Sequence, residues 1–167
     1  MSFHIIAAGE DHTTDIIRIF RTVTDTGTSY VYPEDMSDAD IIRYWFTETA
    51  LYVAIDDTSG TVIGTFVIRD NKPGRGAHIC NAGFMVDPAH RRKGIGGAMC
   101  DRAIIEATAA GYRGMQFNVV VSTNIASITL WRQKGFTIIG TVPGGYRHKT
   151  AGFVDLYIMF RELTGAL

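Results

Sequence analysis

A short basic and glycine-rich stretch, Arg91 to Ala98, constrains the fold of this chain more than any other segment. It follows an apolar run at 84–86 that has strand character and stops at a proline turn, and a long helical pattern begins within it. Glycines let the backbone approach a ligand closely, and the free N–H groups of a helix start lie at the positive end of the helix dipole. The stretch therefore predicts a strand–turn–helix unit that binds a diphosphate, with a solvated basic turn before an ordinary helix as the alternative.

Composition places the chain among globular proteins. It has 167 residues, of which 46% are apolar and 20% charged, enough to bury a sizeable core. We expect a single domain over residues 1–167, because no repeat, linker or low-complexity segment interrupts the sequence. The formal net charge of −1 gives no general attraction to nucleic acid or to anionic membranes, and no apolar run is long enough for a membrane span.

The cysteines and the first residues of the chain bear on its compartment. Cys80 and Cys100 lie in apolar surroundings without metal-binding spacing, as expected of reduced, buried thiols. Residues 1–9 lack the basic start and apolar run of a signal peptide. We therefore expect a cytoplasmic protein with neither a metal site nor a disulfide.

The pattern of apolar residues and turn signals predicts an α/β fold. Strands are expected at 3–8, 51–55, 62–68, 78–86, 115–121, 136–142 and 153–161. Helices are expected from Asp11 or Thr13 to Val23, from Ser37 or Asp38 to Phe46, and over 94–110 and 124–134. The order β-α-α-β-β-β-α-β-α-β-β favours a mixed, mostly antiparallel sheet with helices on both faces. The unit from 78 to 121 is expected to form a right-handed parallel crossover.

Two motifs on this framework resemble those of the GNAT superfamily of N-acetyltransferases. One is Arg91-x-x-Gly94-x-Gly96 between the fourth strand and the third helix. The other runs from Asn124 to Phe136 and carries Trp131 before its closing glycine. The resemblance covers nearly the whole chain and is strongest from 79 to 140. It implies the GNAT acyltransferase fold, in which the fourth and fifth strands splay apart, and acetyl-CoA as cosubstrate.

Coenzyme A needs an anion cradle, a backbone edge for its pantetheine amides and an apolar slot for its thioester. The N–H groups of 92–97 would form the cradle, and the edge at 84–86 would pair with pantetheine like an added strand. The resemblance implies that Asn124 hydrogen-bonds pantetheine, whereas an N-cap paired with Ser127 is the structural alternative. The predicted cofactor-binding residues are Phe84, Met85, Val86, Arg91, Arg92, Lys93, Gly94, Ile95, Gly96, Gly97, Asn124 and Ser127.

The acid and base of the reaction have no clear candidates. In the family a carboxylate on the fourth strand acts as base and a tyrosine on the fourth helix as acid. Here 78–84 contains no carboxylate, His78 reads as a surface or structural residue, and Trp131 stands where that tyrosine would be. We therefore expect catalysis by positioning and by backbone N–H polarisation of the thioester carbonyl. Because neither cysteine is an obvious nucleophile, the acceptor is expected to attack directly.

Two amides in otherwise apolar strands, Asn81 and Asn118, are candidates for orienting the acceptor. If the two strands diverge, both amides face the gap between them. The segment from Phe117 to Trp131 is similar to fungal acetyltransferases that act on L-azetidine-2-carboxylate and related proline analogues. The alternative is that both amides are structural and paired, like most buried polar groups.

The segments 26–36 and 143–152 are expected to select the acceptor. The first carries Tyr30, Tyr32, Glu34 and Asp35, an aromatic wall with carboxylates that suits an amine. The second is basic and reads as a flexible hairpin end, and its Tyr146 is a distant candidate for the missing acid.

The favoured partner is a small-molecule amine, and the last strands offer an edge for a homodimer. A non-catalytic acyl-CoA-binding module and a protein or peptide N-acetyltransferase stay open as alternatives. A nucleotide-binding phosphate loop fits poorly, because the turn lacks the Gly-Lys-Ser/Thr ending.

Overall fold

A seven-stranded mixed sheet, ordered β1-β2-β3-β4-β5-β7-β6, runs through the structure. The computed structural model describes residues 2–47 and 50–163, so 1, 48–49 and 164–167 of the expected domain lie outside the described residues. The strands are β1 (Phe3–Ala7), β2 (Ala50–Asp56), β3 (Val62–Asp70), β4 (Ile79–Val86), β5 (Gly114–Val121), β6 (Thr137–His148) and β7 (Gly152–Glu162). The helices are α1 (Thr13–Thr24), α2 (Asp38–Phe46), α3 (Ile95–Ala109) and α4 (Ile125–Gln133). The predicted order and the α/β class are confirmed.

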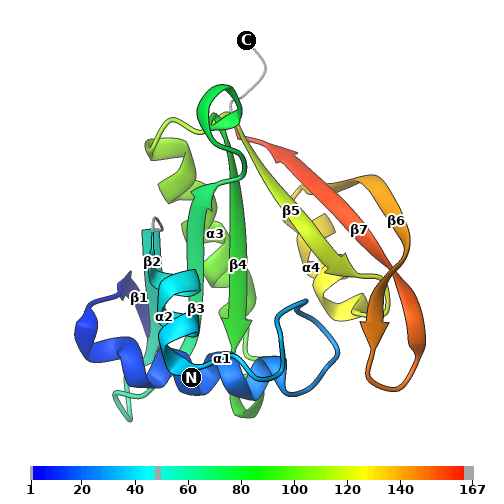
Figure 1. Cartoon of the computed structure of the whole chain (residues 1–167). Coiled ribbons are helices and arrows are strands. Elements are labelled where there is room, and N and C mark those ends of the chain that lie inside the picture. Colours follow the sequence, from blue (N-terminus) through cyan, green and yellow to red (C-terminus); the bar gives the residue numbers. More distant parts are fainter. Residues whose placement is uncertain (1, 48–49, 164–167) are drawn as a thin grey trace.

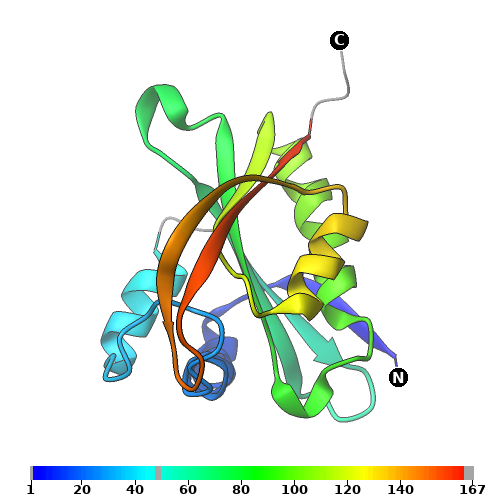
Figure 2. The same cartoon turned by 90° about the vertical axis from the view of Figure 1, so that its right-hand side faces the viewer.

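Helices cover both faces of the sheet, as the sequence predicts (Figures 1 and 2). On the α3/α4 face, Phe66, Met99, Met115 and their neighbours form one buried cluster. On the α1/α2 face, Phe20 and Trp45 lie at the centre of a second. β3 passes between the two and is buried from Val62 to Ile68, which explains its continuous apolar run. No helix among the described residues is long and apolar enough to cross a membrane.

The start of α1 differs from the prediction. Ser37 caps α2 as expected, accepting a hydrogen bond from the Asp40 N–H at 3.1 Å. Neither Asp11 nor Thr13 caps α1, because a short 3₁₀ turn, Glu10–His12, leads into this helix. The Gly9 N–H donates to His12 Nδ1 at 2.9 Å. Local bonding within the turn thus replaces the expected cap.

The segment 143–152 is more regular than the sequence suggests. β6 continues through Pro143 to His148, and Tyr146 pairs with Val154 of β7. The register shifts between Val142 and Tyr146, and such an irregularity can hold a proline that donates no ladder hydrogen bond. The prediction ended the strand at the proline, so it missed the pairing beyond it.

The central feature of the sheet is a fork between β4 and β5. The two strands pair in parallel only at Ile79–Gly114, Cys80–Met115 and Asn81–Gln116, and then diverge (Figure 1). At the closed end, a Cβ on Gly114 would lie 2.5 Å from the Phe160 ring, so only glycine fits there without a shift of that ring. The splayed strands implied by the family resemblance are therefore present.

Candidate active site at the fork of the sheet

Below the closed end of the fork, β4 has a free edge. The Tyr30 hydroxyl accepts a hydrogen bond from the Phe84 N–H at 3.0 Å and donates one to the Phe84 carbonyl oxygen at 2.6 Å. The backbone groups of Phe84 therefore point away from β3, into the fork. Those of Val86, two residues on, share this edge, whereas Met85 faces β3 and buries its side chain among α1 and α2. Two of the three predicted edge residues thus present backbone groups to the fork.

The turn that follows β4 has the conformation of an anion-binding loop. Arg92 and Gly94 both adopt left-handed backbone, with φ of 61° and 80°. The Ala98 N–H donates to the Gly94 carbonyl, so the N–H groups of 95–97 precede the first intrahelical donor and have no intrahelical acceptor. Arg91, Arg92 and Lys93 are exposed, and no described residue forms an ion pair with them. The turn therefore offers backbone donors and positive charge to an anion.

The glycines of the first α3 turn also allow close helix packing. A Cβ on Gly96 or Gly97 would lie 3.4 or 3.6 Å from the Leu130 side chain. These small residues thus let α4 lie directly beside the start of α3. Buried Ile95 anchors the same turn in the core.

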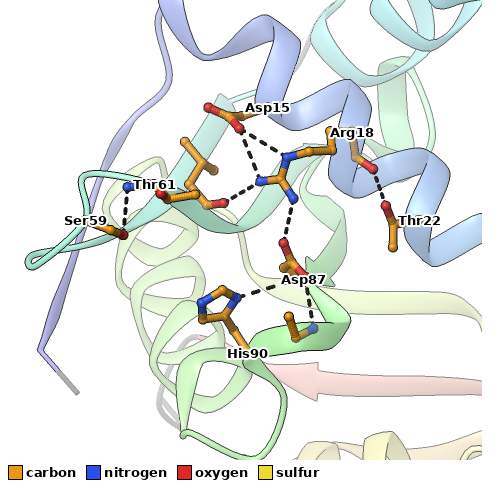
Figure 3. Close-up of polar contacts among 9 residues, drawn as sticks. Asp15, Arg18, Thr22, Ser59, Thr61, Asp87 and His90 are labelled. Carbon is orange, nitrogen blue, oxygen red and sulfur yellow. Dashed lines mark hydrogen bonds and ion pairs between the residues drawn. The ribbon is translucent and has the colours of Figure 1, made fainter.

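An ion pair holds this turn in place (Figure 3). Arg18 of α1 donates to the buried Asp87 carboxylate at 2.6 Å and to the Val62 carbonyl at 2.9 Å. The second oxygen of Asp87 accepts from the Ala89 N–H at 3.0 Å. Burial raises the pKa of Asp87, but the Arg18 and Ala89 hydrogen bonds outweigh burial and hold it below its usual range. The end of β4 is thereby tied to α1 and β3.

On the α1/α2 face, a chain of hydrogen-bonded amides crosses the closed end of the fork. The Asn81 side chain donates to the main-chain carbonyl oxygen of Gln116 at 2.8 Å. The Gln116 side chain donates to Asn118 at 2.8 Å, and Asn118 donates to Asn71 at 2.6 Å. The strand alternation puts Asn81, Gln116 and Asn118 on one face, opposite the buried Cys80 and Phe117.

The sequence prediction included two members of this chain and missed the other two. Gln116 lies two residues before Asn118 on the same strand, and this spacing predicts that both side chains lie on the same face of the sheet. Asn71 had no such signal, because it reaches Asn118 from a loop 47 positions away.

Comparison with known proteins decides the family. The profile of the Acetyltransferase (GNAT) family matches residues 16–136. The chain belongs to the GNAT family. It is similar to a GCN5-related N-acetyltransferase from Kribbella flavida, at 36% identity and a TM-score of 0.92 over 96% of this chain and 97% of that one.

Other relatives add fold and sequence similarity. N-acetyltransferase aca1 of Schizosaccharomyces pombe is 42% identical over 109 residues, which are 65% of this chain and 52% of that protein, so the chain spans about half of its length. A phosphinothricin acetyltransferase from Sinorhizobium meliloti, solved in complex with acetyl-CoA, shares the fold at 24% identity and a TM-score of 0.88, over 97% of this chain and 89% of that one.

The second GNAT motif forms the start and body of α4. Asn124 is the N-cap, and its side-chain oxygen accepts from the Ser127 N–H at 3.2 Å. Asn124 therefore caps α4 together with Ser127, and the contact of Asn124 with pantetheine stays a prediction. Trp131 is buried against Phe84 and Phe117, with ring centroids 5.1 and 4.9 Å away. It thus fills the α3/α4 side of the fork.

Other groups that could take part in acyl transfer have structural partners or are buried. Burial raises the pKa of the Tyr146 phenol, and the role of Tyr146 as an acid stays a prediction. Cys80 and Cys100 are buried, and desolvation raises the pKa of each thiol to about 12. His78 is exposed just before β4. The part of the chain that the structure describes holds no group of three or more His, Cys, Asp or Glu residues that could bind a metal.

We expect Asp87→Asn to destabilise the protein by about 1.5–3 kcal/mol at pH 7, because it removes a charge-assisted hydrogen bond and keeps an acceptor for Ala89. The Asp87 carboxyl has a depressed pKa, so its contribution is complete above the unfolded pKa of about 3.9 and is lost as pH falls through the lower folded value. Urea unfolding of both proteins at pH 7, 5 and 3 measures this difference. A difference that is unchanged at pH 3 would contradict the assignment to the ion pair.

Proposed function

We propose that this chain is an N-acetyltransferase that transfers the acetyl group of acetyl-CoA to a small primary or secondary amine, such as an amino acid or an analogue. The observation that carries the proposal is the free edge of β4 at Phe84, which leads directly into the anion-binding turn. Coenzyme A carries its pantetheine arm next to its diphosphate. It therefore needs an edge for the arm followed directly by a site for the anion, which is the order of β4 and the turn. GNAT membership and the acetyl-CoA complex of a protein with the same fold support the same arrangement.

On the cosubstrate side, the turn from Arg91 to Gly97 would hold the diphosphate, through its N–H groups and its three basic side chains. The backbone carbonyl of Phe84 and the backbone groups of Val86 would pair with the pantetheine amides. Trp131 and Phe117 provide an apolar wall for the thioester. The Asn124 cap uses only the side-chain oxygen, which leaves its NH₂ group for pantetheine.

In the reaction, the neutral acceptor nitrogen attacks the thioester carbon while the Phe84 N–H polarises the carbonyl. The amides Asn81 and Asn118 would orient the acceptor from the α1/α2 face. The 78–84 segment supplies no carboxylate, so water would carry the proton away from the nitrogen. High-pKa, buried thiols are poor nucleophiles, which favours direct attack over an acyl-enzyme.

The 25–36 loop covers the α1/α2 side of the fork, where the acceptor would enter, and this favours a small acceptor over a peptide. The 25–36 loop is bound to the β6–β7 hairpin, since the Lys149 N–H donates to the Gly27 carbonyl at 3.0 Å and Lys149 Nζ to the Asp25 carbonyl at 3.1 Å. The same loop contacts β4 through Tyr30. It therefore crosses from β4 to the β6–β7 hairpin, which pairs with β5, on the α1/α2 side of the fork (Figure 2).

The first experiment is a thiol-release assay with acetyl-CoA and a panel of amino acids, proline analogues, polyamines and peptides. We expect release of coenzyme A with one class of small amines and with no peptide. Tight binding of acetyl-CoA without turnover of any acceptor would instead favour a non-catalytic acyl-CoA-binding module. Turnover with peptides alone would contradict the small-amine proposal.

The anion turn is tested by Gly94→Asp. A carboxylate there would repel the diphosphate, and we expect the Kd for acetyl-CoA to rise at least about tenfold, which calorimetry measures. Gly111→Asp is the matched control, because Gly111 has a similar φ of 87° at the far end of α3 and likewise has no atom within 4 Å of a Cβ. Equal affinities of the two variants would contradict the assignment of the turn.

The acceptor side is tested by Asn118→Ala. We expect the KM for the acceptor to rise about tenfold, the loss typical of one good hydrogen bond, while the Kd for acetyl-CoA is unchanged. Asn71→Ala is the control, because it removes the hydrogen-bond partner of Asn118 and leaves the Asn118 amide in place. If both variants lose only stability, and by similar amounts, Asn118 is a structural amide.

A further inference from the structure

The Tyr30 hydroxyl takes the place of a neighbouring strand at the free edge of β4. It accepts from the Phe84 N–H and donates to the Phe84 carbonyl, the two bonds that a paired strand would otherwise make. A backbone N–H has one hydrogen to donate. When the thioester carbonyl accepts that hydrogen, as in the reaction above, its oxygen takes the position of the Tyr30 oxygen, and the Tyr30 hydroxyl moves aside and donates to it.

Tyr30 is held in this position by an aromatic stack. Its ring is stacked on Tyr32, with centroids 5.3 Å apart and planes 11° from parallel. It meets the buried Trp45 edge-on at 6.4 Å. The loop around it is fixed at the end of α1, where Thr26 bonds the Val23 carbonyl at 2.7 Å, and at the β6–β7 hairpin through Gly27. A ring held in this way keeps its hydroxyl next to the reacting atoms, so the hydroxyl needs only a short shift to donate to the carbonyl oxygen. A small reorganisation is the condition for effective electrostatic catalysis.

The Tyr30 phenol is in its neutral form, which can donate a hydrogen bond to a carbonyl oxygen. Burial raises the pKa of Tyr30 above its usual range, and the Phe84 N–H offsets this only in part. Tyr30 is therefore neutral at physiological pH and has a proton to share in a hydrogen bond. So high a pKa makes it a poor proton donor to a thiolate, so its role differs from that of a general acid.

We propose that Tyr30 is a catalytic residue, whose O–H and the Phe84 N–H together hold the acetyl carbonyl oxygen as it becomes negatively charged. The inference rests on the proposed function. The acceptor nitrogen forms a C–N bond with the carbonyl carbon, and the carbonyl π pair moves to the oxygen between the two donors. The pair then re-forms the carbonyl as the C–S bond breaks and its electrons leave with the coenzyme A sulfur. The proton of the nitrogen passes to water, the thiolate is protonated from solvent, and Tyr30 keeps its proton throughout.

The test is Tyr30→Phe, which removes only the hydroxyl. We expect kcat to fall about 100-fold, the lower end of the loss seen when one oxyanion donor is removed. The Kd for acetyl-CoA, measured by calorimetry, is expected to stay the same or to decrease, because the hydroxyl no longer occupies the Phe84 N–H. The matched control is Tyr44→Phe, since Tyr44 of α2 meets the same stack edge-on at Tyr32, with ring centroids 5.0 Å apart, and lies outside the loop. This control is expected to retain kcat within about threefold.

The outcomes separate the inference from the function on which it rests. A wild-type enzyme that turns over and a Tyr30→Phe variant with unchanged kcat would overturn the role of Tyr30 alone. If that variant bound acetyl-CoA more tightly at unchanged kcat, Tyr30 would only compete for the free edge, and the inference would equally fail. Similar losses of kcat in the Tyr30 and Tyr44 variants would indicate a packing role and would also overturn it. A wild-type protein that binds acetyl-CoA but acetylates nothing would overturn the proposed function and the inference together.

Discussion

Hydrogen bonding between β4 and β5 stops after Asn81 and Gln116, and the rest of the site depends on this. Peptide groups that leave a sheet must find other partners, because an unpaired backbone donor or acceptor away from water is costly. At Phe84, the Tyr30 hydroxyl meets this requirement with one oxygen. A bound pantetheine would meet it along a longer stretch of the edge. The backbone groups of β4 that lose their partners at the fork are thus the groups that the pantetheine amides would bind.

The two faces of the sheet divide the chemistry between them. The α3/α4 face provides the anion turn, the α4 cap and the aromatic wall of Phe84, Phe117 and Trp131. The α1/α2 face provides the amide chain and the loop with Tyr30. The Arg18–Asp87 ion pair connects the two, because it fixes the end of β4 from the acceptor side and so positions the turn on the other. Both ligands would meet at the β4 backbone, with the thioester carbon between them.

The sequence predicted the parts of the site that depend on local patterns. The glycine-rich turn, the Asn124 cap and the order of elements follow from residues close together in the chain, and the structure contains them. The contacts it could not predict join distant residues. Tyr30 was recognised as part of an aromatic loop, but its bond to Phe84 spans 54 positions. Arg18 meets Asp87 across 69 positions, and an exposed helical arginine gives no sign of such a partner. The errors at α1 and β6 were local: a histidine acceptor replaced a conventional cap, and a strand continued beyond a proline.

The loop between α1 and α2 links the two arms of the fork, since it binds β4 through Tyr30 and the β6–β7 hairpin through Gly27. The width of the opening is therefore set by a segment that lies outside the sheet. Lengthening or shortening this segment would change the separation of β4 from the β6–β7 hairpin as well as the shape of the proposed acceptor site. The loop proposed to select the acceptor and the geometry proposed to align the thioester would then have to evolve together. The anion turn, which the Arg18–Asp87 ion pair fixes, would be free to stay the same.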